Sequence, residues 1–207
     1  MEILRVDYGR SRLPESMLFP GGAEEKEVPI VFSVFLVLTG VHKILVDAGC
    51  DTMPGFEMED FCGTVAALQG LGYEPKDITH VILTHAHHDH IQGIKDFPHA
   101  QVYIQQAEYI RGKKHIPETC RVHTFAETCR VVEGVVAKCI GGHTEGSCVV
   151  EVQGRNTVYV LCGDECYSRS NLTERIPTGS SFCPEKSAAF IQKYTQPGYT
   201  CLLCHDL

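Results

Sequence analysis

The segment THAHHDH at residues 84–90 concentrates four histidines and one aspartate within seven consecutive positions. Protonated imidazoles repel one another and neutral ones need hydrogen-bond partners, so an ordinary fold gains little from such crowding. The run HVIL comes directly before it and is typical of a buried strand that delivers side chains to a site at its end. A bound metal ion explains both features, whereas a solvated histidine-rich loop would need neither the strand nor the aspartate.

The spacing within this segment indicates how its side chains divide between two ions. In a nearly extended chain, His85 and His87 lie on the same side and can bind one metal ion. The turn that follows lets Asp89 and His90 face a second ion, whereas His88 has the wrong parity and is expected to point elsewhere. Four ligands from one loop cannot complete two coordination spheres, so further ligands must come from other segments.

Three downstream residues occupy the same topological position, at the end of a strand-like segment. His143 lies in IGGHTEGS, Asp164 in YVLCGDECY and His205 in LLCHDL. An isolated histidine at a strand end is more often a structural or surface residue. Together with the histidine-rich segment, however, these three predict a site for two metal ions.

Local patterns predict a layered α/β fold. Strand-like runs rich in β-branched residues occur at 3–7, 30–38, 43–47, 79–83, 101–104, 135–140, 147–152, 157–162 and, as the short run CLLC, 201–204. Helices are expected at 60–72, at 184–195, from the end of the histidine cluster and near 105–110, with loops around 21–27, 111–119 and 168–181. Strands in two sets separated by helices favour a sandwich of two mixed sheets covered by helices over a doubly wound sheet.

Length and charge limit the number of domains and the kinds of partner that the chain can have. A chain of 207 residues suits one well-filled core, which predicts a single domain over residues 1–207. Asp and Glu number 26 against 18 Lys and Arg without a basic stripe, which argues against a nucleic-acid partner.

The longest apolar stretch, 30–38, is too short to cross a bilayer, and the start MEILRVDYGR does not resemble a signal peptide. We expect a cytoplasmic protein that binds no membrane; a homodimer is compatible with the sequence.

Eleven cysteines are many for this length, but the number is odd and the chain is no small secreted scaffold. Most are expected to be reduced, buried thiols. Cys201 and Cys204 are three residues apart in a predicted strand, so they face opposite sides and cannot jointly chelate one ion. Cys162 and Cys166 flank the Gly-Asp pair, and ligation by them is the second choice there.

The ligand pattern resembles the metallo-β-lactamase superfamily: His-x-His-x-Asp-His after a strand, then Gly-His, Gly-Asp and a final His. The likeness runs over residues 36–206 and includes ILVDAG at 44–49, similar to an early strand that ends in an Asp near the site. It implies an αββα sandwich with a dinuclear metal centre along one edge. By this resemblance the first ion is held by His85, His87 and His143, the second by Asp89, His90 and His205, and Asp164 bridges the two.

Within the superfamily the chain is most similar to N-acyl-homoserine lactone lactonases, the quorum-quenching enzymes. LGYEPKDITHVILTHAHHDHIQG, IQQAEY, FCPEKSAAFIQKY and CLLCHD resemble their segments, and GDECY places Tyr167 where these enzymes have a catalytic tyrosine. This implies a hydrolase that opens a lactone or a related small ester with a bridging hydroxide. Tyr167 would act at the substrate carbonyl or leaving oxygen, and Asp89 would pass a proton to the leaving alkoxide.

The sequence also departs from the lactonase pattern. Gln92 replaces a Gly, Gly141 and Glu145 stand where Pro is common, and Cys204 replaces the Gly before the last His; none of these removes a ligand. The stretch between residues 109 and 122 is shorter than the substrate-lining insertion of known lactonases.

Several alternatives stay open. Zinc suits nitrogen and carboxylate ligands best among divalent ions, with iron, manganese and cobalt as alternatives. A thioesterase of glyoxalase II type shares the ligand set but is expected to need a C-terminal helical region, and a metal-centre ligand-sensing protein without turnover would not need Tyr167. Asp47 and Thr84 either orient histidine ligands or simply cap strand ends.

Overall fold

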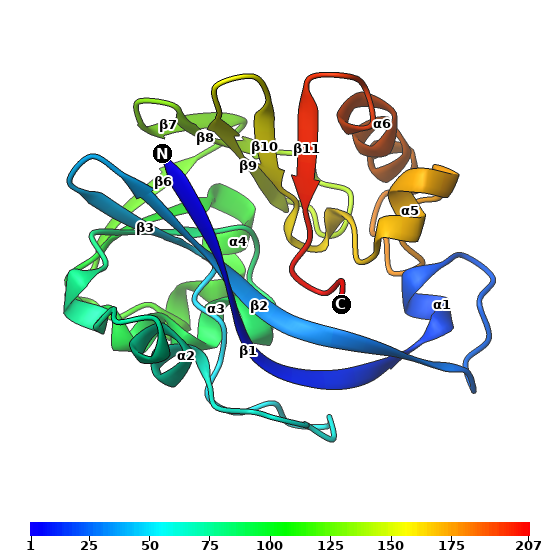
Figure 1. Ribbon diagram of the computed structural model, residues 1–207, viewed down its shortest axis with the longest axis horizontal. Helices are drawn as coiled ribbons and strands as arrows, with labels where there is room; N and C mark the ends of the chain where they lie inside the picture. Colours follow the sequence, from blue (N-terminus) through cyan, green and yellow to red (C-terminus); the bar gives the residue numbers. More distant parts are fainter.

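The computed structural model describes residues 1–207 and consists of two β-sheets packed face to face, with helices on both outer faces (Figure 1). The first sheet has the order β1-β2-β3-β4-β5-β6. Its strands are β1 (Glu2–Pro14), β2 (Glu27–Thr39), β3 (His42–Val46), β4 (His80–Leu83), β5 (Gln101–Gln105) and β6 (Arg121–Phe125). Strands β1 to β3 pair antiparallel and β3 to β6 pair parallel, so the sheet is mixed.

The second sheet is also mixed and has the order β11-β10-β9-β8-β7. Only β10 and β11 pair parallel. Its strands are β7 (Thr128–Val132), β8 (Val135–Cys139), β9 (Cys148–Gln153), β10 (Val158–Leu161) and β11 (Tyr199–Leu202). The predicted αββα sandwich is therefore confirmed.

Six α-helices and four short 3₁₀ helices cover the sheets. The α-helices are α1 (Glu15–Leu18), α2 (Thr64–Gly70), α3 (His88–Ile91), α4 (Gln106–Gly112), α5 (Arg169–Glu174) and α6 (Pro184–Tyr194). The 3₁₀ helices are η1 (Pro75–Asp77), η2 (Gln92–Asp96), η3 (Lys113–His115) and η4 (Gly163–Glu165). All four predicted helices are present, as α2, α3, α4 and α6. The prediction of a loop over 168–181 was wrong in part, because Ser168 and Asn171 form a capping box that starts α5.

The predicted strands are confirmed with two omissions, β6 and β7. Both are edge strands, RVHTF and TCRVV, whose side chains are mostly half-buried or exposed, so they carry no continuous apolar run. Strands β1 and β2 also extend well beyond the predicted 3–7 and 30–38. Their additional residues form a long hairpin that pairs as far as Pro14 with Glu27, and polar residues in it hid the strand pattern.

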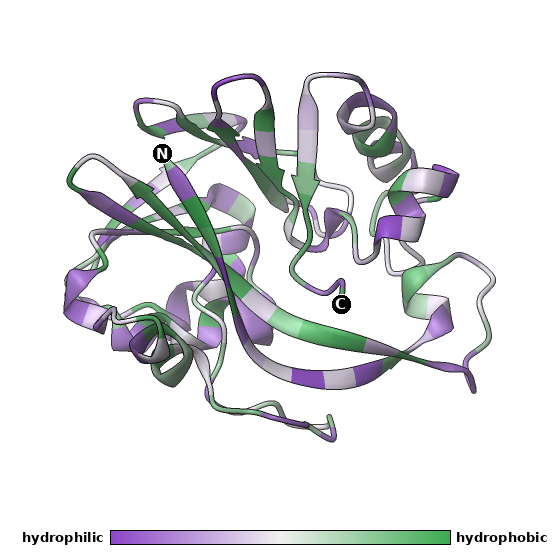
Figure 2. Ribbon diagram, viewed as in Figure 1, coloured by the Kyte–Doolittle hydropathy of each residue, from purple (hydrophilic) through white to green (hydrophobic).

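Three buried clusters hold the layers together. Phe35 and Ile82 of the first sheet pack against Val150 of the second in the cluster between the sheets. A second cluster packs the other face of the first sheet against Leu68 of α2 and the residues around η2, and a third packs the second sheet against α6. In Figure 2 hydrophobic residues follow the strands, while hydrophilic residues gather on the helices and turns.

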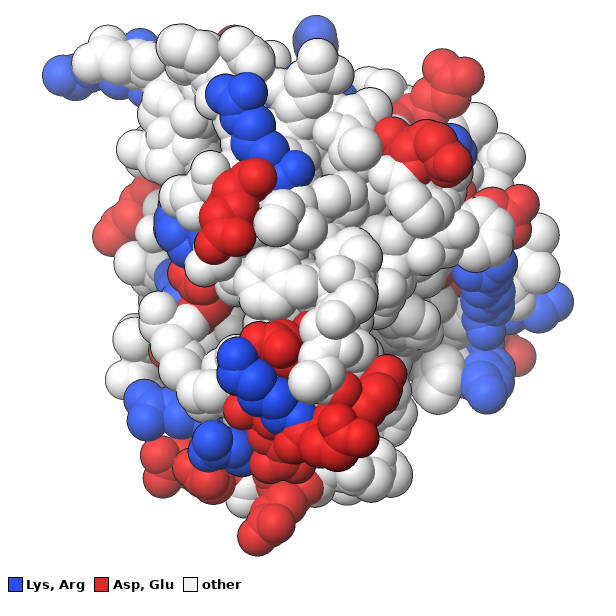
Figure 3. Space-filling view, turned by 90° about the vertical axis from the view of Figure 1, so that its right-hand side faces the viewer, with Lys and Arg blue, Asp and Glu red and all other residues white.

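The surface gives two further observations. On the face shown in Figure 3, Lys and Arg side chains are interspersed with Asp and Glu instead of forming one basic stripe. No helix combines the length and the apolar character that crossing a membrane requires.

Three histidines and Tyr103 also form a row of contacting rings across the first sheet, away from the histidine-rich segment. The ring of His80 lies 5.0 Å from His42 and 5.9 Å from Tyr103, and Tyr103 lies 4.7 Å from His123 between ring centroids. Burial, together with the charges of His42 and His123, lowers the pKa of His80. The folded protein therefore binds a proton at His80 less readily than the unfolded chain does.

We expect this histidine to make the protein less stable in mild acid. Because the pKa of His80 is lower in the folded protein, protonating this ring lowers the stability of the fold. This loss of stability is absent above the unfolded pKa of about 6.5 and grows as the pH falls below that value. His80→Phe retains a ring but cannot titrate, so its urea midpoint should fall less than that of the wild type between about pH 7.5 and pH 5.5. His99→Gln at an exposed position is the control, and an equal fall in wild type and His80→Phe would contradict this prediction.

Candidate metal centre

The seven predicted ligand residues meet at one edge of the sandwich, between the two sheets. Strand β4 ends at Leu83 and leads to His85 and His87, and the β8–β9 connection carries His143. Asp164 lies in η4 after β10, and His205 follows β11. Since strand ends from both sheets meet here, residues up to 120 positions apart become neighbours.

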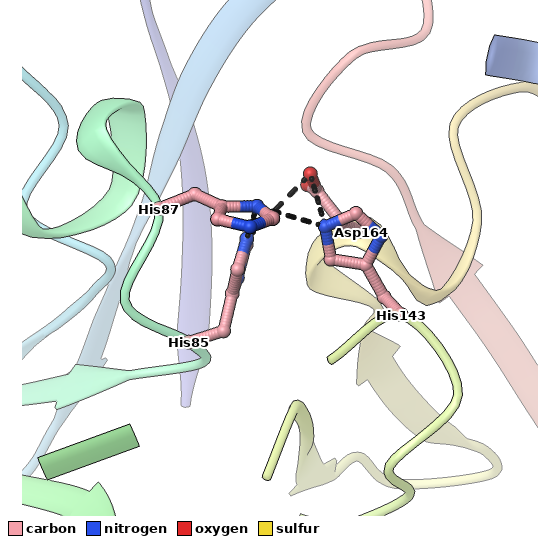
Figure 4. A group of neighbouring side chains, drawn as sticks. All are labelled: His85, His87, His143 and Asp164. Atoms are coloured by element: carbon pink, nitrogen blue, oxygen red, sulfur yellow. Dashed lines mark hydrogen bonds and ion pairs between the residues drawn. The ribbon is translucent and has the colours of Figure 1, made fainter. Parts of the chain in front are cut away.

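Three imidazoles converge on one point in the first group (Figure 4). The Nε2 atoms of His85 and His143 each lie 3.0 Å from Nδ1 of His87. Asp164 Oδ2 lies 3.4 Å from His143 Nε2 and 3.7 Å from His85 Nε2. A neutral imidazole has one N–H donor, so hydrogen bonds alone cannot satisfy three ring nitrogens that face one another. This group could hold a metal ion.

A second group forms around the other oxygen of Asp164. Asp164 Oδ1 lies 3.0 Å from His90 Nε2 and 3.1 Å from His205 Nε2. Asp89 Oδ2 lies 3.3 Å from His90 Nε2 and 3.6 Å from His205 Nε2. His90, Asp164 and His205 could hold a second ion, and Asp164 belongs to both groups. Asp89, predicted as a ligand of this ion, lies beside the group but is not one of its members. The Cys204 thiol, which the sequence interpretation did not include, is a further donor atom in this group.

The outer ring nitrogens show that the second group suits a metal. Nδ1 of His205 lies 2.9 Å from the Val31 carbonyl oxygen, and Nδ1 of His90 lies 2.8 Å from Asp47 Oδ2. Carbonyl and carboxylate oxygens only accept, so each Nδ1 is a donor. Burial acts to lower the pKa of His90 and His205, but Asp164, together with Cys204 at His205, raises it well above the ordinary value, so each Nε2 binds a proton that a metal ion would displace. Nε2 of His90 is buried and forms no hydrogen bond of normal geometry, which fits a metal ligand.

Asp47 contacts a candidate ligand and Thr84 instead of merely ending a strand. Its carboxylate accepts from Nδ1 of His90 and from both the backbone N–H and the hydroxyl of Thr84, at 2.7 and 2.9 Å. Thr84 Oγ1 in turn lies 3.1 Å from His85 Nδ1. The geometry therefore favours the orienting role for both residues over a plain strand cap.

Burial and nearby charges set the protonation states of His85 and Asp164. Burial and the charge of His90 lower the pKa of His85 well below its ordinary value, so this imidazole is neutral. Burial acts against ionisation of Asp164, but the charges of the neighbouring His90 and His205 outweigh it and lower its pKa well below the usual range. A neutral imidazole and an ionised carboxylate are the forms that bind a divalent cation.

Tyr167 stands beside these groups. Its hydroxyl donates to Asp164 Oδ2 at 3.0 Å, and its ring centroid lies 5.3 Å from that of His205. Burial and the charge of Asp164 raise the pKa of Tyr167 well above its ordinary value, so the hydroxyl stays protonated and can donate. As predicted, His88 points elsewhere: its Nε2 lies 2.8 Å from the Thr52 carbonyl oxygen.

Comparison with known families agrees with this geometry, since residues 29–189 match the family model of the metallo-beta-lactamase superfamily. The chain belongs to the metallo-β-lactamase superfamily. The match spans both sheets and includes every residue of the first group.

Two curated relatives are similar over part of their length. A probable metallo-hydrolase of Mycobacterium tuberculosis is 32% identical over 135 residues, which cover 52% of this chain and 43% of that protein. An N-acyl homoserine lactonase of Bacillus cereus is 26% identical over 167 residues, which cover 74% of this chain and 66% of that protein. The match thus spans less than two thirds of either relative.

Solved structures share the superfamily fold over almost the whole chain. An N-acyl homoserine lactone hydrolase with N-hexanoyl-L-homoserine at its catalytic metal centre has a TM-score of 0.83 at 21% identity, covering 99% of this chain and 93% of that one. A probable metal-dependent hydrolase from Staphylococcus aureus has a TM-score of 0.86 at 21% identity, covering 99% and 89%. At this level of identity, the likeness establishes the fold.

An apolar cavity of about 660 Å³ opens onto the site. Its polar end includes Asp89, Asp164 and Tyr167. Its hydrophobic wall comes from the β1–β2 hairpin and neighbouring segments: Leu13, Met17, Ile30, Phe32, Met53, Phe56 and Phe182. None of the lining residues lies between 109 and 122, where the lactonase resemblance places a substrate-lining insertion. Ile30 and Phe32 do alternate along β2, but the sequence does not indicate which sheet face meets a cavity.

Two buried glutamates, both missed at the sequence level, hold the His143 loop. Glu108 accepts from the Thr144 hydroxyl at 2.7 Å and from the Gly146 N–H at 3.0 Å, and its other oxygen accepts from the Ala86 N–H at 2.9 Å. Glu108 therefore ties the histidine-rich segment to the His143 loop. Glu165 accepts from the backbone N–H groups of Gly142 and His143 on the opposite side, and burial raises its pKa to about 7.

We expect Glu108→Ala to weaken metal binding about 10- to 100-fold, the usual cost of losing an outer partner of metal ligands. The reason is that both ligand-bearing segments lose a shared acceptor. Competition with a coloured chelator measures the affinity. Glu145→Ala in the same loop, whose side chain is 62% exposed, is the matched control. Equal metal affinities for wild type and Glu108→Ala would show that Glu108 does not support the metal site through these two segments.

The cysteines are all free thiols. Cys201 lies in the cluster beneath α6, while Cys204 lies in the cluster between the sheets, so the two face opposite sides as predicted. Neither Cys162 nor Cys166 belongs to a group that could hold a metal ion.

Proposed function

We propose that this protein is a hydrolase that depends on two divalent metal ions and opens a lactone or a related small ester. The observation that carries the proposal is the Tyr167 hydroxyl, which donates to Asp164 at the polar end of an apolar cavity, beside two groups of residues that could hold metal ions. The similarity to N-acyl homoserine lactonases agrees with this assignment.

We assign the first ion to His85, His87 and His143, the second to Asp89, His90 and His205, and a bridging role to Asp164. Zinc fits this set of nitrogen and carboxylate donors best. Bound ions would supply an activated water and polarise the carbonyl oxygen of the substrate.

The chain's own residues would then orient the substrate and move protons. Tyr167 stays protonated and can donate to the oxygen that gains charge at the carbonyl or to the leaving oxygen. Asp89 can pass a proton to the leaving alkoxide, since its side chain is 13% exposed and Tyr8 fixes its backbone by donating to its carbonyl oxygen at 2.9 Å. The apolar wall suits a substrate with a hydrophobic tail.

The deciding experiment compares homoserine lactones of increasing acyl length with simple esters and thioesters, using metal-loaded protein and pH detection. We expect lactones to be preferred and kcat/KM to rise about four-fold per added methylene until the cavity is filled, because burying one methylene contributes about 0.8 kcal/mol. Phe32→Ala should flatten this dependence, and Phe190→Ala in the core beneath α6 is the control.

Other results would assign a different function. Preference for thioesters would favour the thioesterase, and no turnover of any compound would favour the ligand sensor. We also propose a small-molecule partner and a cytoplasmic location; a homodimer is tested by light scattering.

A further inference from the structure

Cys139 and Cys148 form a directly opposed pair across strands β8 and β9. The N–H of Cys139 donates to the Glu127 carbonyl at 2.8 Å and that of Cys148 to the Thr84 carbonyl at 2.9 Å, so neither donates across the pair. In such a non-hydrogen-bonded antiparallel pair the Cα atoms lie about 4.5 Å apart with side chains on the same face. A disulfide spans Cα separations of about 4.4 to 6.8 Å, so the backbone already permits the bond.

The two thiols differ in accessibility. Cys148 is 1% exposed, whereas Cys139 is only half-buried. The adjacent Cys148 side chain lowers the pKa of Cys139, and the Lys186 ammonium acts in the same direction against the effect of burial. A partly exposed cysteine with a lowered pKa, next to a buried partner, is the arrangement of an attacking and a resolving cysteine.

We propose that Cys139 and Cys148 form a reversible disulfide when the protein meets a small disulfide such as oxidised glutathione, and that this bond closes the base of the His143 loop. The Cys139 thiolate attacks one sulfur of the oxidised glutathione, and one glutathione leaves as a thiolate and takes up a proton. The Cys148 thiol then loses its proton to solvent and attacks the Cys139 sulfur, and the second glutathione leaves as a thiolate and takes up a proton. Two protein thiols are oxidised and one glutathione disulfide is reduced.

The bond would lie at the base of residues 140–147. The N–H groups of Ile140 and Gly141 donate to the Ser147 carbonyl at 2.8 and 3.0 Å, and the Cys148 thiol donates to the Gly146 carbonyl at 3.1 Å. A covalent link at this point limits local opening of the loop, since its ends can no longer separate. This inference rests on sheet pairing and thiol access, so it is independent of the proposed hydrolase activity.

A second thiol pair provides an internal comparison. The neighbouring Cys162 side chain lowers the pKa of Cys201. However, Cys162 is 0% and Cys201 6% exposed, and Val160, not Cys162, lies opposite Cys201 in the parallel pairing. We therefore expect this pair to react much more slowly than Cys139 and Cys148.

The test treats the whole metal-loaded protein with mixtures of reduced and oxidised glutathione, alkylates the remaining thiols and maps peptides by mass spectrometry. We expect a Cys139–Cys148 link that a dithiol reverses, with both cysteines lost from alkylation together. Amide hydrogen exchange over residues 140–147 should slow several-fold in the oxidised protein. If the disulfide forms but amide hydrogen exchange over residues 140–147 does not change, the proposal that the bond closes the loop is overturned.

Two variants separate attacking from resolving roles. Cys148→Ser should accumulate glutathione on Cys139, and Cys139→Ser should leave Cys148 reduced. The exposed Cys62 reports that the oxidant is active. The proposal is overturned if Cys139 and Cys148 stay reduced while Cys62 is modified, if Cys148 reacts in Cys139→Ser, or if the Cys162–Cys201 pair closes first.

Discussion

Asp164→Asn is expected to release metal from both groups and to reduce hydrolysis to the background rate. Each carboxylate oxygen faces a different group, at 3.0 Å from His90 Nε2 and 3.4 Å from His143 Nε2, so one substitution removes a charged donor from both. The loss of affinity should exceed the roughly 100-fold upper range for losing an outer partner of a ligand. Asparagine keeps the shape of the side chain, which separates loss of charge from loss of packing.

Metal content per chain, measured by elemental analysis after gel filtration, checks this expectation. Asp60→Asn is the control, because its side chain is 81% exposed and pairs only with Arg10 at the surface. His143→Ala should by contrast affect mainly the first group and leave one equivalent bound. Two equivalents retained in Asp164→Asn would rule out the bridging role.

Tyr167→Phe is expected to lower kcat about 100-fold while metal content stays unchanged, since losing one donor to a developing oxyanion costs about 10²- to 10³-fold. The ring still fills its place beside His205, and only the hydroxyl that donates to Asp164 is lost. Because the donor acts mainly in the transition state, kcat should change more than KM.

Steady-state kinetics with the preferred lactone, together with metal analysis, measure this effect. Tyr103→Phe is the matched control, since Tyr103 does not line the cavity. If Tyr167→Phe kept full activity, the proposed role at the carbonyl would be wrong, and the tyrosine would serve only to position Asp164.

The sequence predicts most of this fold because its elements follow local rules. Buried strands such as β4 are mainly apolar, and α6 begins with Pro184 at its first turn. The edge strands β6 and β7 escape these rules, since half-exposed strands carry mixed side chains. That residues 1–207 form a single domain stays a prediction, which one cooperative unfolding transition would support.

The candidate ligands could also be predicted from the sequence. Four of its members lie within residues 84–90, and the other three follow strand-like segments, so spacing and strand ends pointed to the residues that the structure brings together. Their roles as ligands stay predictions until metal is measured.

By itself, the sequence determined the layered fold and the candidate ligands, because alternation along strands and clustering at strand ends are properties of neighbouring residues. Only the tertiary structure decided that Asp47 orients His90, that Glu108 joins two loops, that Cys139 faces Cys148, and that the β1–β2 hairpin lines the cavity. These features depend on contacts between segments distant in sequence, and sheet register and packing of the layers fix such contacts.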